Sequence, residues 1–449
     1  MKKILIFGAG RSATSLITYL VKNAAAYDWF VQVADMSLSL AEEKIKGSAL
    51  AEAIEFVADN QMQRQTLINN ADLVISMLPV NLHTLVATDC VAFGKCLFNA
   101  SYISPELKAM EQAIIDKKLL FLCELGLDPG IDHMSAMKII HELQSQQAEI
   151  LSFRSYTGGL VAPQDDDNLW NYKFSWNPRN VVLAGQSTAK YLYQNKLKIV
   201  PYQRLFAEAE TVYIPNRGYY EIYPNRDSLS YRSLYNLETV PTLLRATIRH
   251  QGYSVAWNVL LQLGLTDDSY KIAHSETLTY RDFFFSFLPA QQFETAQDIM
   301  RYLSVRFNFH LDSDVAEKIR FLQLWDNMPV QLSNASPAQI LQQRLEQLWV
   351  LLPQQKDLVI MQHEFIYRLN GKKYLHLSTL YQIGENAINT AMANLVGLPL
   401  AIAAKQFLTG QIQLHGLHIP ILAAVYQPIL NELEQLGVVF SEQITEISG

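Results

Sequence analysis

A glycine-rich loop follows the first apolar run of the sequence. Residues 3–7 form that run, and the next six residues, Gly8 to Ala13, have the spacing G-x-G-x-x-A and lead into a helical pattern over residues 13–22. Two glycines allow a tight turn and a close approach of a pyrophosphate to the backbone, and the small third residue lets helix and strand pack. The helix N-terminus adds N–H donors and the positive end of its dipole. The motif therefore predicts a dinucleotide-binding domain with contacts from Gly8, Gly10, Arg11, Ser12 and Ala13.

An acidic residue ends the second apolar run, at residues 29–34. Asp35 lies close to the expected distance of roughly 20 residues beyond the glycine loop, where a carboxylate accepts hydrogen bonds from the ribose hydroxyls. The same carboxylate would repel the extra phosphate of NADP. We therefore expect NAD as the cofactor, with NADP as the alternative; the competing interpretation is an exposed Asp at a strand end.

Short apolar runs alternate with helical patterns through the first 130 residues. The runs cover residues 3–7, 29–34, 72–77, 95–99 and 119–123, and the helical patterns cover residues 13–22, 41–53 and 105–116. Alternation of this kind is typical of a parallel, doubly wound sheet. Ser76 to Pro79 lie at the end of the third run, so Leu78 and Pro79 either pack on the nicotinamide side of a dinucleotide or simply leave the strand.

The pattern changes after about residue 130. Residues 150–157, 211–214 and 219–223 are β-branched and aromatic, residues 255–351 are mostly helical, and residues 357–369 and 374–381 form a hairpin through Asn370-Gly371. We expect an α/β protein with an N-terminal Rossmann doubly wound sheet, an α+β mixed-sheet domain and a helical insertion. The expected parts are residues 1–129 for the Rossmann domain, 130–264 with 352–385 for the mixed sheet, 265–351 for the helical region and 411–449 for a C-terminal segment.

Composition excludes several classes of protein. The formal net charge is -7, so the protein lacks the positive surface that would bind nucleic acid or an anionic membrane.

The three cysteines, Cys90, Cys96 and Cys123, lack C-x-x-C spacing, so we expect a reducing compartment, no disulfide framework and no metal site. The first apolar run is too short for a secretory signal, and no run reaches the roughly 18 residues of a membrane span. We expect the protein in the cytoplasm.

Two further strand ends carry unusual residues. One is Asn99-Ala100-Ser101-Tyr102, and the other runs from Glu124 to His133 as E-L-G-L-D-P-G-I-D-H. These residues resemble the saccharopine dehydrogenase family, in its glutamate-forming branch, also called saccharopine reductase. The resemblance continues, in order, through residues 155–160, 172–176, 223–228, 245–252, 357–363 and 394–399. The helical region from about residue 265 to 350 matches least.

The resemblance implies the residues of the site. Cofactor contacts fall on the glycine loop and on Leu78, Pro79, Leu127, Asp128, Pro129 and Trp176. Substrate contacts fall on Ser101, Tyr102, Asp128, Arg226, Thr247, Ile248 and Arg249. The family also implies that residues 386–410 return to pack on the Rossmann domain. Two departures stand out: the fungal biosynthetic members carry a basic residue near Asp35, and they carry a cysteine at the position of Thr157.

The implied activity is that of an NAD(P)-dependent oxidoreductase acting on a CH–NH group. It would oxidise saccharopine to L-glutamate and 2-aminoadipate 6-semialdehyde, in lysine metabolism, by hydride transfer from the C–N carbon and hydrolysis of the resulting imine. The dinucleotide carries the redox step, while the protein aligns the C–H bond and moves protons. The partners are then small molecules, with no nucleic acid and no membrane. The sequence sets no oligomeric state, and a homodimer is the assembly to test.

The substrate's chemistry suggests roles for particular side chains. Saccharopine carries three carboxylates, and Arg226 and Arg249 have the planar fork that binds a carboxylate through two hydrogen bonds. Proton transfer needs a group near the amine, and the candidates are Tyr102, Asp128, His133 and Lys173. We choose Asp128 and Tyr102 as catalytic; the alternative role of Asp128 is to cap a helix beginning near Ile131. His133 is otherwise a packed helix residue, and Lys173 otherwise binds a carboxylate.

Two other functions compete with this interpretation. A related amine dehydrogenase, such as carboxynorspermidine dehydrogenase or a homospermidine synthase-like enzyme, would handle polyamines and favour acidic groups over the paired Arg226 and Arg249. A non-catalytic dinucleotide-binding protein would keep the glycine loop and lose the substrate motifs, whereas this chain has both.

Overall fold

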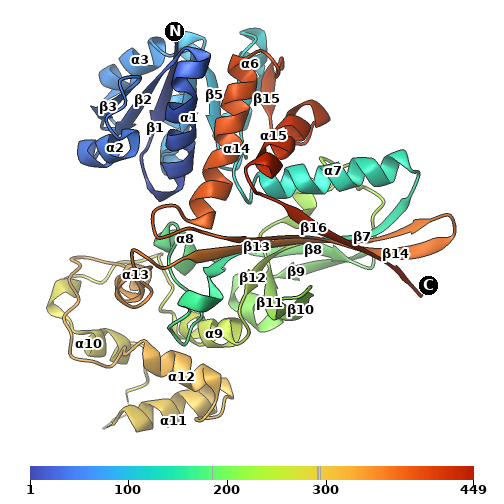
Figure 1. The fold of residues 1–449 in the computed structure, drawn as a ribbon. Helices are drawn as coiled ribbons and strands as arrows, with labels where there is room; N and C mark the ends of the chain where they lie inside the picture. The colour runs from blue at the N-terminus through green and yellow to red at the C-terminus, as the bar shows by residue number, and fades with distance from the viewer. Residues whose placement is uncertain (185, 291–292, 294, 449) are drawn as a thin grey trace. The chain divides into compact units, whose positions relative to one another are not determined.

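The computed structural model describes residues 1–184, 186–290, 293 and 295–448. The chain divides into two compact units (Figure 1). Unit 1 consists of Met1–Glu149 and Leu380–Ser441, and unit 2 consists of Ile150–Thr379 and Glu442–Gly449. Each unit is described by itself below.

Unit 1 is built on a parallel sheet with the strand order β15-β6-β5-β4-β1-β2-β3. Its strands are β1 (Lys2–Phe7), β2 (Trp29–Asp35), β3 (Ala51–Glu55), β4 (Leu73–Ser76), β5 (Cys96–Asn99), β6 (Leu120–Leu122) and β15 (Gly416–His418). The order reverses between β1 and β4, which is the place where open α/β sheets bind ligands. The expected doubly wound N-terminal sheet is confirmed.

Helices surround this sheet within unit 1 (Figure 1). They are η1 (Arg11–Ala13), α1 (Thr14–Tyr27), α2 (Leu38–Ile45), α3 (Gln61–Asn69), η2 (Val80–Leu82), α4 (His83–Phe93), α5 (Pro105–Ala109), α6 (Glu111–Asp116), α7 (Ile131–Ser145), α14 (Ala391–Leu408) and α15 (Ala423–Gln435). Side chains of Ser37, Asn60 and Ser104 cap α2, α3 and α5 by accepting backbone N–H bonds.

The expected helix over residues 41–53 is wrong. Lys46 and Gly47 both adopt left-handed backbone angles, with φ of 50° and 67°, and end α2 there. The following residues then pair in parallel with β2 as strand β3. Residues of high helix propensity thus form an edge strand, because pairing with β2 outweighs a weak local preference.

Helix α14 packs against α1 at a point of very close backbone approach. A Cβ atom added at Gly397 would lie 2.7 Å from the backbone nitrogen of Leu16. The same contact region joins Ser15 to Asn394 through a hydrogen bond. By length and hydropathy α14 is a candidate membrane span, with a mean hydropathy of 1.4 over 18 residues, but 72% of that window is buried inside the protein. The expectation that no apolar run reaches the length of a membrane span is therefore wrong for α14, whose burial is that of a core helix.

We predict that Gly397→Ala lowers the melting temperature, although alanine favours a helix over glycine. The added methyl group must displace the backbone of α1, and overpacking of this kind costs about 1–3 kcal/mol. Differential scanning fluorimetry of the two proteins measures the effect. An unchanged or higher melting temperature would show that α1 and α14 can separate without cost.

Unit 2 contains a mixed sheet with the order β10-β11-β12-β7-β13-β14-β16, and β8 joins it through β12 and carries β9. The strands are β7 (Glu149–Val161), β8 (Ala189–Tyr193), β9 (Lys196–Val200), β10 (Glu210–Ile214), β11 (Gly218–Pro224), β12 (Thr242–Arg249), β13 (Asp357–Leu369), β14 (Lys372–Ile383) and β16 (Phe440–Ile447). β12 runs parallel to β7 and antiparallel to β11. Asn370 and Gly371 both have positive φ between β13 and β14, so the predicted hairpin is confirmed.

The helices of unit 2 share a buried hydrophobic cluster with several of its strands. They are η3 (Pro163–Asp165), α8 (Pro178–Val182), η4 (Tyr202–Glu208), η5 (Ser228–Tyr231), α9 (Tyr253–Leu263), η6 (Ser275–Thr277), α10 (Tyr280–Phe285), α11 (Ala296–Phe307), α12 (Asp314–Phe321) and α13 (Pro337–Leu348). Capping boxes begin α10, α11 and α13 at Thr279, Thr295 and Ser336. One buried cluster runs from Trp170 through Trp257 to Trp349, so the helical insertion and the sheet domain share a core.

The two units and the parts expected from sequence differ in three places. α7, expected in the mixed-sheet domain, belongs to unit 1, where its His141 bonds the hydroxyl of Tyr426 on α15 at 2.7 Å. The helical region belongs to unit 2 rather than standing apart. The C-terminal segment divides, since β15 joins the sheet of unit 1 and β16 joins the sheet of unit 2.

Candidate active site

The glycine loop leads from β1 into η1 at the reversal point of the unit 1 sheet. Gly8 has a φ of 99°, and a Cβ atom there would lie 2.9 Å from the carbonyl oxygen of Met77 after β4, so glycine is needed for both reasons. No described side chain caps η1, whose N-cap is Gly10. The turn thus presents its amino end in the way that binds phosphate groups.

Asp35 lies at the carboxyl end of β2, next to this loop. Its Oδ2 atom accepts a hydrogen bond from the backbone nitrogen of Ala9 at 2.7 Å, and its Oδ1 accepts one from Ser37 at 2.9 Å. The carboxylate is therefore held by two backbone donors beside the predicted phosphate loop. Leu78 is half-buried and Pro79 is exposed after β4.

The ends of β4 and β5 are joined by a histidine that sequence reasoning missed. His83, the first residue of α4, is 2.8 Å from the Ser76 hydroxyl through Nδ1 and 2.8 Å from the Ser101 hydroxyl through Nε2. Burial lowers the pKa of His83 to about 4, so its ring is neutral near pH 7. Asn99 accepts the backbone N–H of Ser101 at 2.9 Å. A cavity of about 10 Å³ lies beside these strand ends and is lined in part by His83, Asn99 and Tyr102.

Tyr102 and Asp128, the two predicted catalytic residues, meet within unit 1. The Tyr102 hydroxyl is 3.3 Å from Oδ1 of Asp128, and both residues are half-buried. The N-cap of α7 is Gly130, which has no side chain to cap the helix, and its N–H is donated to Asp132 in the first turn of α7 at 2.6 Å. The catalytic role of Asp128 and its alternative role as a helix cap both stay predictions.

His133 is fully buried and pairs with a carboxylate from the end of β6. Its Nε2 atom is 2.8 Å from Oε2 of Glu124. The other oxygen of Glu124 accepts the backbone N–H of Ile103 at 3.3 Å. His133 therefore fixes the segment that carries Asp128, and the interpretation as a packed helix residue fits this position better than proton transfer.

Arg249 ends β12 in unit 2 as a buried guanidinium group. It is only 3% exposed, and its Nη1 donates to the carbonyl oxygen of Ile248 at 2.8 Å. Its guanidinium carbon lies 5.2, 5.9 and 5.3 Å from the ring centres of Tyr172, Tyr223 and Tyr253. Its Nε atom is buried without a hydrogen-bond partner, and no described carboxylate pairs with the group. Arg249 is therefore a buried positive charge without a negatively charged partner among the described residues, and the three tyrosine rings partly stabilise it.

The remaining predicted residues of unit 2 have varied surroundings. Arg226 is exposed in the loop after β11, with a φ of 51°, whereas Thr247 on β12 is half-buried and Ile248 is buried. The buried Lys173 ammonium is 2.7 Å from Asp167 and 2.5 Å from the side-chain oxygen of Gln355, so protein groups already match its charge. Trp176 donates to the Tyr172 hydroxyl at 3.2 Å.

Thr157 stands where the resemblance places a cysteine in the fungal biosynthetic members. It pairs with Thr247 in the register of β7 and β12. Its buried hydroxyl oxygen has no hydrogen-bond partner among the described residues. A hydroxyl in this position can bond to a ligand but cannot perform thiol chemistry.

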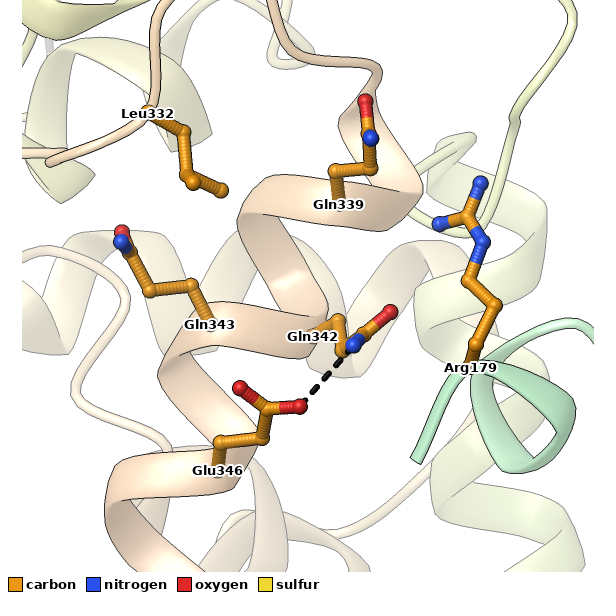
Figure 2. Close-up of a pocket in the computed structure, with 6 residues that line it drawn as sticks. All are labelled: Arg179, Leu332, Gln339, Gln342, Gln343 and Glu346. Atoms are coloured by element: carbon orange, nitrogen blue, oxygen red, sulfur yellow. Dashed lines mark hydrogen bonds between the residues drawn. The ribbon is translucent and has the colours of Figure 1, made fainter. Parts of the chain in front are cut away.

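A hollow of about 300 Å³ lies beside α13 in unit 2 (Figure 2). Its lining residues are Arg179, Leu332, Gln339, Gln342, Gln343 and Glu346. Gln342 donates to Glu346 across one turn of the helix at 2.9 Å, and Arg179 pairs with Asp268. None of the predicted site residues lines this hollow. The described residues also contain no group of three or more side chains suited to a metal ion.

Comparison with known proteins decides the family. The family model described as the saccharopine dehydrogenase NADP binding domain matches residues 4–122, and the model described as the saccharopine dehydrogenase C-terminal domain matches residues 126–438. The chain belongs to the saccharopine dehydrogenase family. The resemblance found in the motifs is confirmed, and so is the class of oxidoreductase acting on CH–NH donors.

Individual relatives and solved structures match over nearly all of the chain. The saccharopine dehydrogenase [NADP(+), L-glutamate-forming] of Schizosaccharomyces pombe is 30% identical, over 99% of this chain and 100% of the relative. The apo saccharopine dehydrogenase (L-Glu forming) structure from Saccharomyces cerevisiae has a TM-score of 0.82 at 31% identity, covering 99% of this chain and 100% of that one. The homospermidine synthase from Legionella pneumophila, in complex with NAD, has a TM-score of 0.56 at 8% identity, over 99% of this chain and 91% of that one. This last likeness concerns the fold alone.

The comparisons support the expected reaction, but they do not support the expected cofactor and do not test the expected site residues. They favour the saccharopine dehydrogenase interpretation over the polyamine enzymes and over a non-catalytic protein. The description of the N-terminal model supports NADP, so the preference for NAD stays a prediction. Which of the named residues contact ligands also stays a prediction.

Proposed function

We propose that this protein oxidises saccharopine with a nicotinamide dinucleotide and releases L-glutamate and 2-aminoadipate 6-semialdehyde. The full-length match to glutamate-forming saccharopine dehydrogenases carries the proposal. Saccharopine, the oxidised dinucleotide and water give glutamate, the semialdehyde, the reduced dinucleotide and a proton. The hydride leaves the terminal carbon of the aminoadipate part, and water hydrolyses the imine that forms.

The buried Arg249 guanidinium supports an anionic substrate. Arginine stays charged at any physiological pH, and a desolvated charge without an opposite partner is costly. A carboxylate of saccharopine supplies the missing partner through charge-assisted hydrogen bonds. We assign the transfer of the amine proton to Tyr102 and Asp128. The Tyr102 hydroxyl donates a hydrogen bond to the Asp128 carboxylate, so a proton donor and a proton acceptor lie side by side in unit 1. The bound dinucleotide supplies the hydride acceptor.

The proposed cofactor preference is for NAD. The Asp35 carboxylate is fixed by the N–H groups of Ala9 and Ser37 beside the phosphate loop, so it cannot easily turn away from a ribose phosphate. A phosphate on the ribose and a carboxylate fixed beside it repel each other. The Schizosaccharomyces pombe relative is described as an NADP(+) enzyme, and this chain would differ from it in cofactor.

We predict that Asp35→Ala and Asp35→Asn lower the ratio of kcat/KM with NAD to kcat/KM with NADP by about tenfold or more. A tenfold change in this ratio corresponds to about 1.4 kcal/mol. The ratio is insensitive to general damage, which affects both cofactors equally. Glu55→Ala is the matched control, because Glu55 is the exposed register partner of Asp35 on β3. If Glu55→Ala moves the ratio as much as Asp35→Asn does, the general field around the strands sets the preference and Asp35 has no specific role.

The function itself is tested by the rate at which absorbance of the reduced dinucleotide appears with saccharopine, using NAD and NADP in turn. Carboxynorspermidine is the comparison substrate. Turnover of saccharopine at a kcat/KM at least about a hundredfold above that for carboxynorspermidine is expected, because a buried, unpaired arginine discriminates strongly between acidic and basic groups. Preference for the polyamine, or no turnover of either, would refute the proposal.

The cellular setting completes the proposal. We place the protein in the cytoplasm, within lysine metabolism, acting on small molecules alone, and we propose a homodimer as its assembly. The sparse, unpaired cysteines suit a reducing compartment. Fractionation of cells and light scattering of the purified protein test the two points separately.

A further inference from the structure

Two residues without a role in the family motifs, Ser76 and His83, form a hydrogen-bonded chain in unit 1 with the predicted substrate contact Ser101. Ser76 ends β4, His83 begins α4, and Ser101 follows β5. Each ring nitrogen of His83 lies 2.8 Å from one serine hydroxyl. Ser76 is fully buried and His83 is 7% exposed, whereas Ser101 is half-buried.

The backbone of Ser101 is held firmly on both sides. Its N–H donates to the side-chain oxygen of Asn99 at 2.9 Å, and its carbonyl oxygen accepts the N–H of Glu124 at 3.1 Å. The Ser101 side chain can then still rotate about its Cα–Cβ bond, and its hydroxyl hydrogen can rotate about the Cβ–Oγ bond. The contact with His83 is therefore what sets the direction of the Ser101 hydroxyl.

Burial decides which tautomer of His83 is present. Among the described residues, Nδ1 of His83 is the hydrogen-bond partner of the buried Ser76 hydroxyl, and buried hydroxyl hydrogens are donated to an acceptor. Ser76 therefore donates to Nδ1, and a neutral ring then carries its hydrogen on Nε2. Nε2 donates to Ser101 in turn, which leaves the Ser101 hydroxyl hydrogen directed to a further acceptor.

We propose that His83 is a positioning residue which, together with Ser76, orients the Ser101 hydroxyl as a donor to an anionic oxygen of the substrate. The inference rests on the proposed function and adds a specificity element to it. A carboxylate oxygen accepts from this hydroxyl, whereas the ammonium groups of a polyamine have no lone pair that could accept its hydrogen. The chain Ser76–His83–Ser101 thus selects an acidic substrate independently of Arg249.

Glutamine and asparagine variants separate this role from a structural one. Glutamine places its amide near the Nε2 position and keeps a donor to Ser101, whereas asparagine places its amide near Nδ1 and loses that donor. His83→Asn and Ser76→Ala should each raise KM for saccharopine by about tenfold or more, the effect of one hydrogen bond to a charged group, with a smaller change in kcat. His83→Gln should restore KM to within about threefold of the wild type. Thr88→Ala, exposed on the same helix, is the control.

A double-mutant cycle with Ser101→Ala completes the test. In that background, His83→Asn should change KM for saccharopine by less than about twofold, because the group it orients is absent. The KM for the dinucleotide is measured in every variant and should stay unchanged. Equal effects of His83→Asn and His83→Gln, additive effects with Ser101→Ala, or parallel losses of dinucleotide binding would each overturn the role of His83 while leaving the proposed function intact. A wild-type protein that does not oxidise saccharopine would overturn both.

Discussion

Arg249→Met is expected to lower kcat/KM for saccharopine by about 10²- to 10³-fold while leaving the protein at least as stable. Two charge-assisted hydrogen bonds to a carboxylate account for a loss of this size. Stability should not fall, because replacing a buried charge that lacks an acidic partner with an apolar side chain of similar length is often neutral or stabilising. Activity and thermal unfolding are measured on the same preparations.

Arg245→Met is the matched control for Arg249→Met. Arg245 is also buried on β12, and its guanidinium stacks over Tyr231 at 4.5 Å. Arg245→Met should change the melting temperature more than it changes the KM for saccharopine. Similar kinetic losses in both variants, or weaker dinucleotide binding in Arg249→Met, would mean that Arg249 acts through the packing of unit 2.

Gly130→Ala should reduce kcat by about a hundredfold or more. A Cβ atom at this position would lie 2.0 Å from the carbonyl oxygen of Gly126, and Gly130 has a φ of 149°, which side chains rarely adopt. The turn over residues 126–130 must therefore move, and Asp128 moves with it away from Tyr102. Displacement of a catalytic group by about 1 Å can cost 10²-fold. Single-turnover measurements separate this effect from product release.

Gly94→Ala provides the control for backbone strain alone. Gly94 has a φ of 68° at the end of α4, and a Cβ atom there meets nothing within 4 Å. That variant should lose about 1 kcal/mol of stability and keep its kcat. If Gly130→Ala also keeps its kcat, the turn does not position a catalytic group and Asp128 loses its proposed role.

The alternation of strands and helices in the N-terminal sheet and the turns with special backbone angles were the parts of the fold that the sequence could predict. The glycine loop and the Asn370-Gly371 turn each need conformations that few residues allow, so their positions in the sequence identify them. The helix expected over residues 41–53 failed because the chain turns at Lys46 and Gly47 and β3 then pairs with β2. A tertiary contact of this kind leaves little trace in local propensity.

The candidate site was predictable only where motifs mark it. Motif resemblance gave Arg226 and Arg249 equal weight, and the structure separates them, since one is exposed and the other is buried among tyrosines. The tyrosines come from β11, α9 and the segment before α8, so no spacing in the sequence reveals the cluster. His83 was missed for the same reason, because its partners Ser76 and Ser101 become neighbours only when β4 and β5 pair.

Product analysis tests the central claim most directly. The purified protein is incubated with saccharopine and the preferred dinucleotide, and the amino acids released are quantified by mass spectrometry against the dinucleotide reduced. We predict one glutamate and one aminoadipate semialdehyde for each dinucleotide reduced. Release of lysine and 2-oxoglutarate instead would show that the other carbon–nitrogen bond is oxidised, and it would contradict the assignment of this chain to the glutamate-forming reaction.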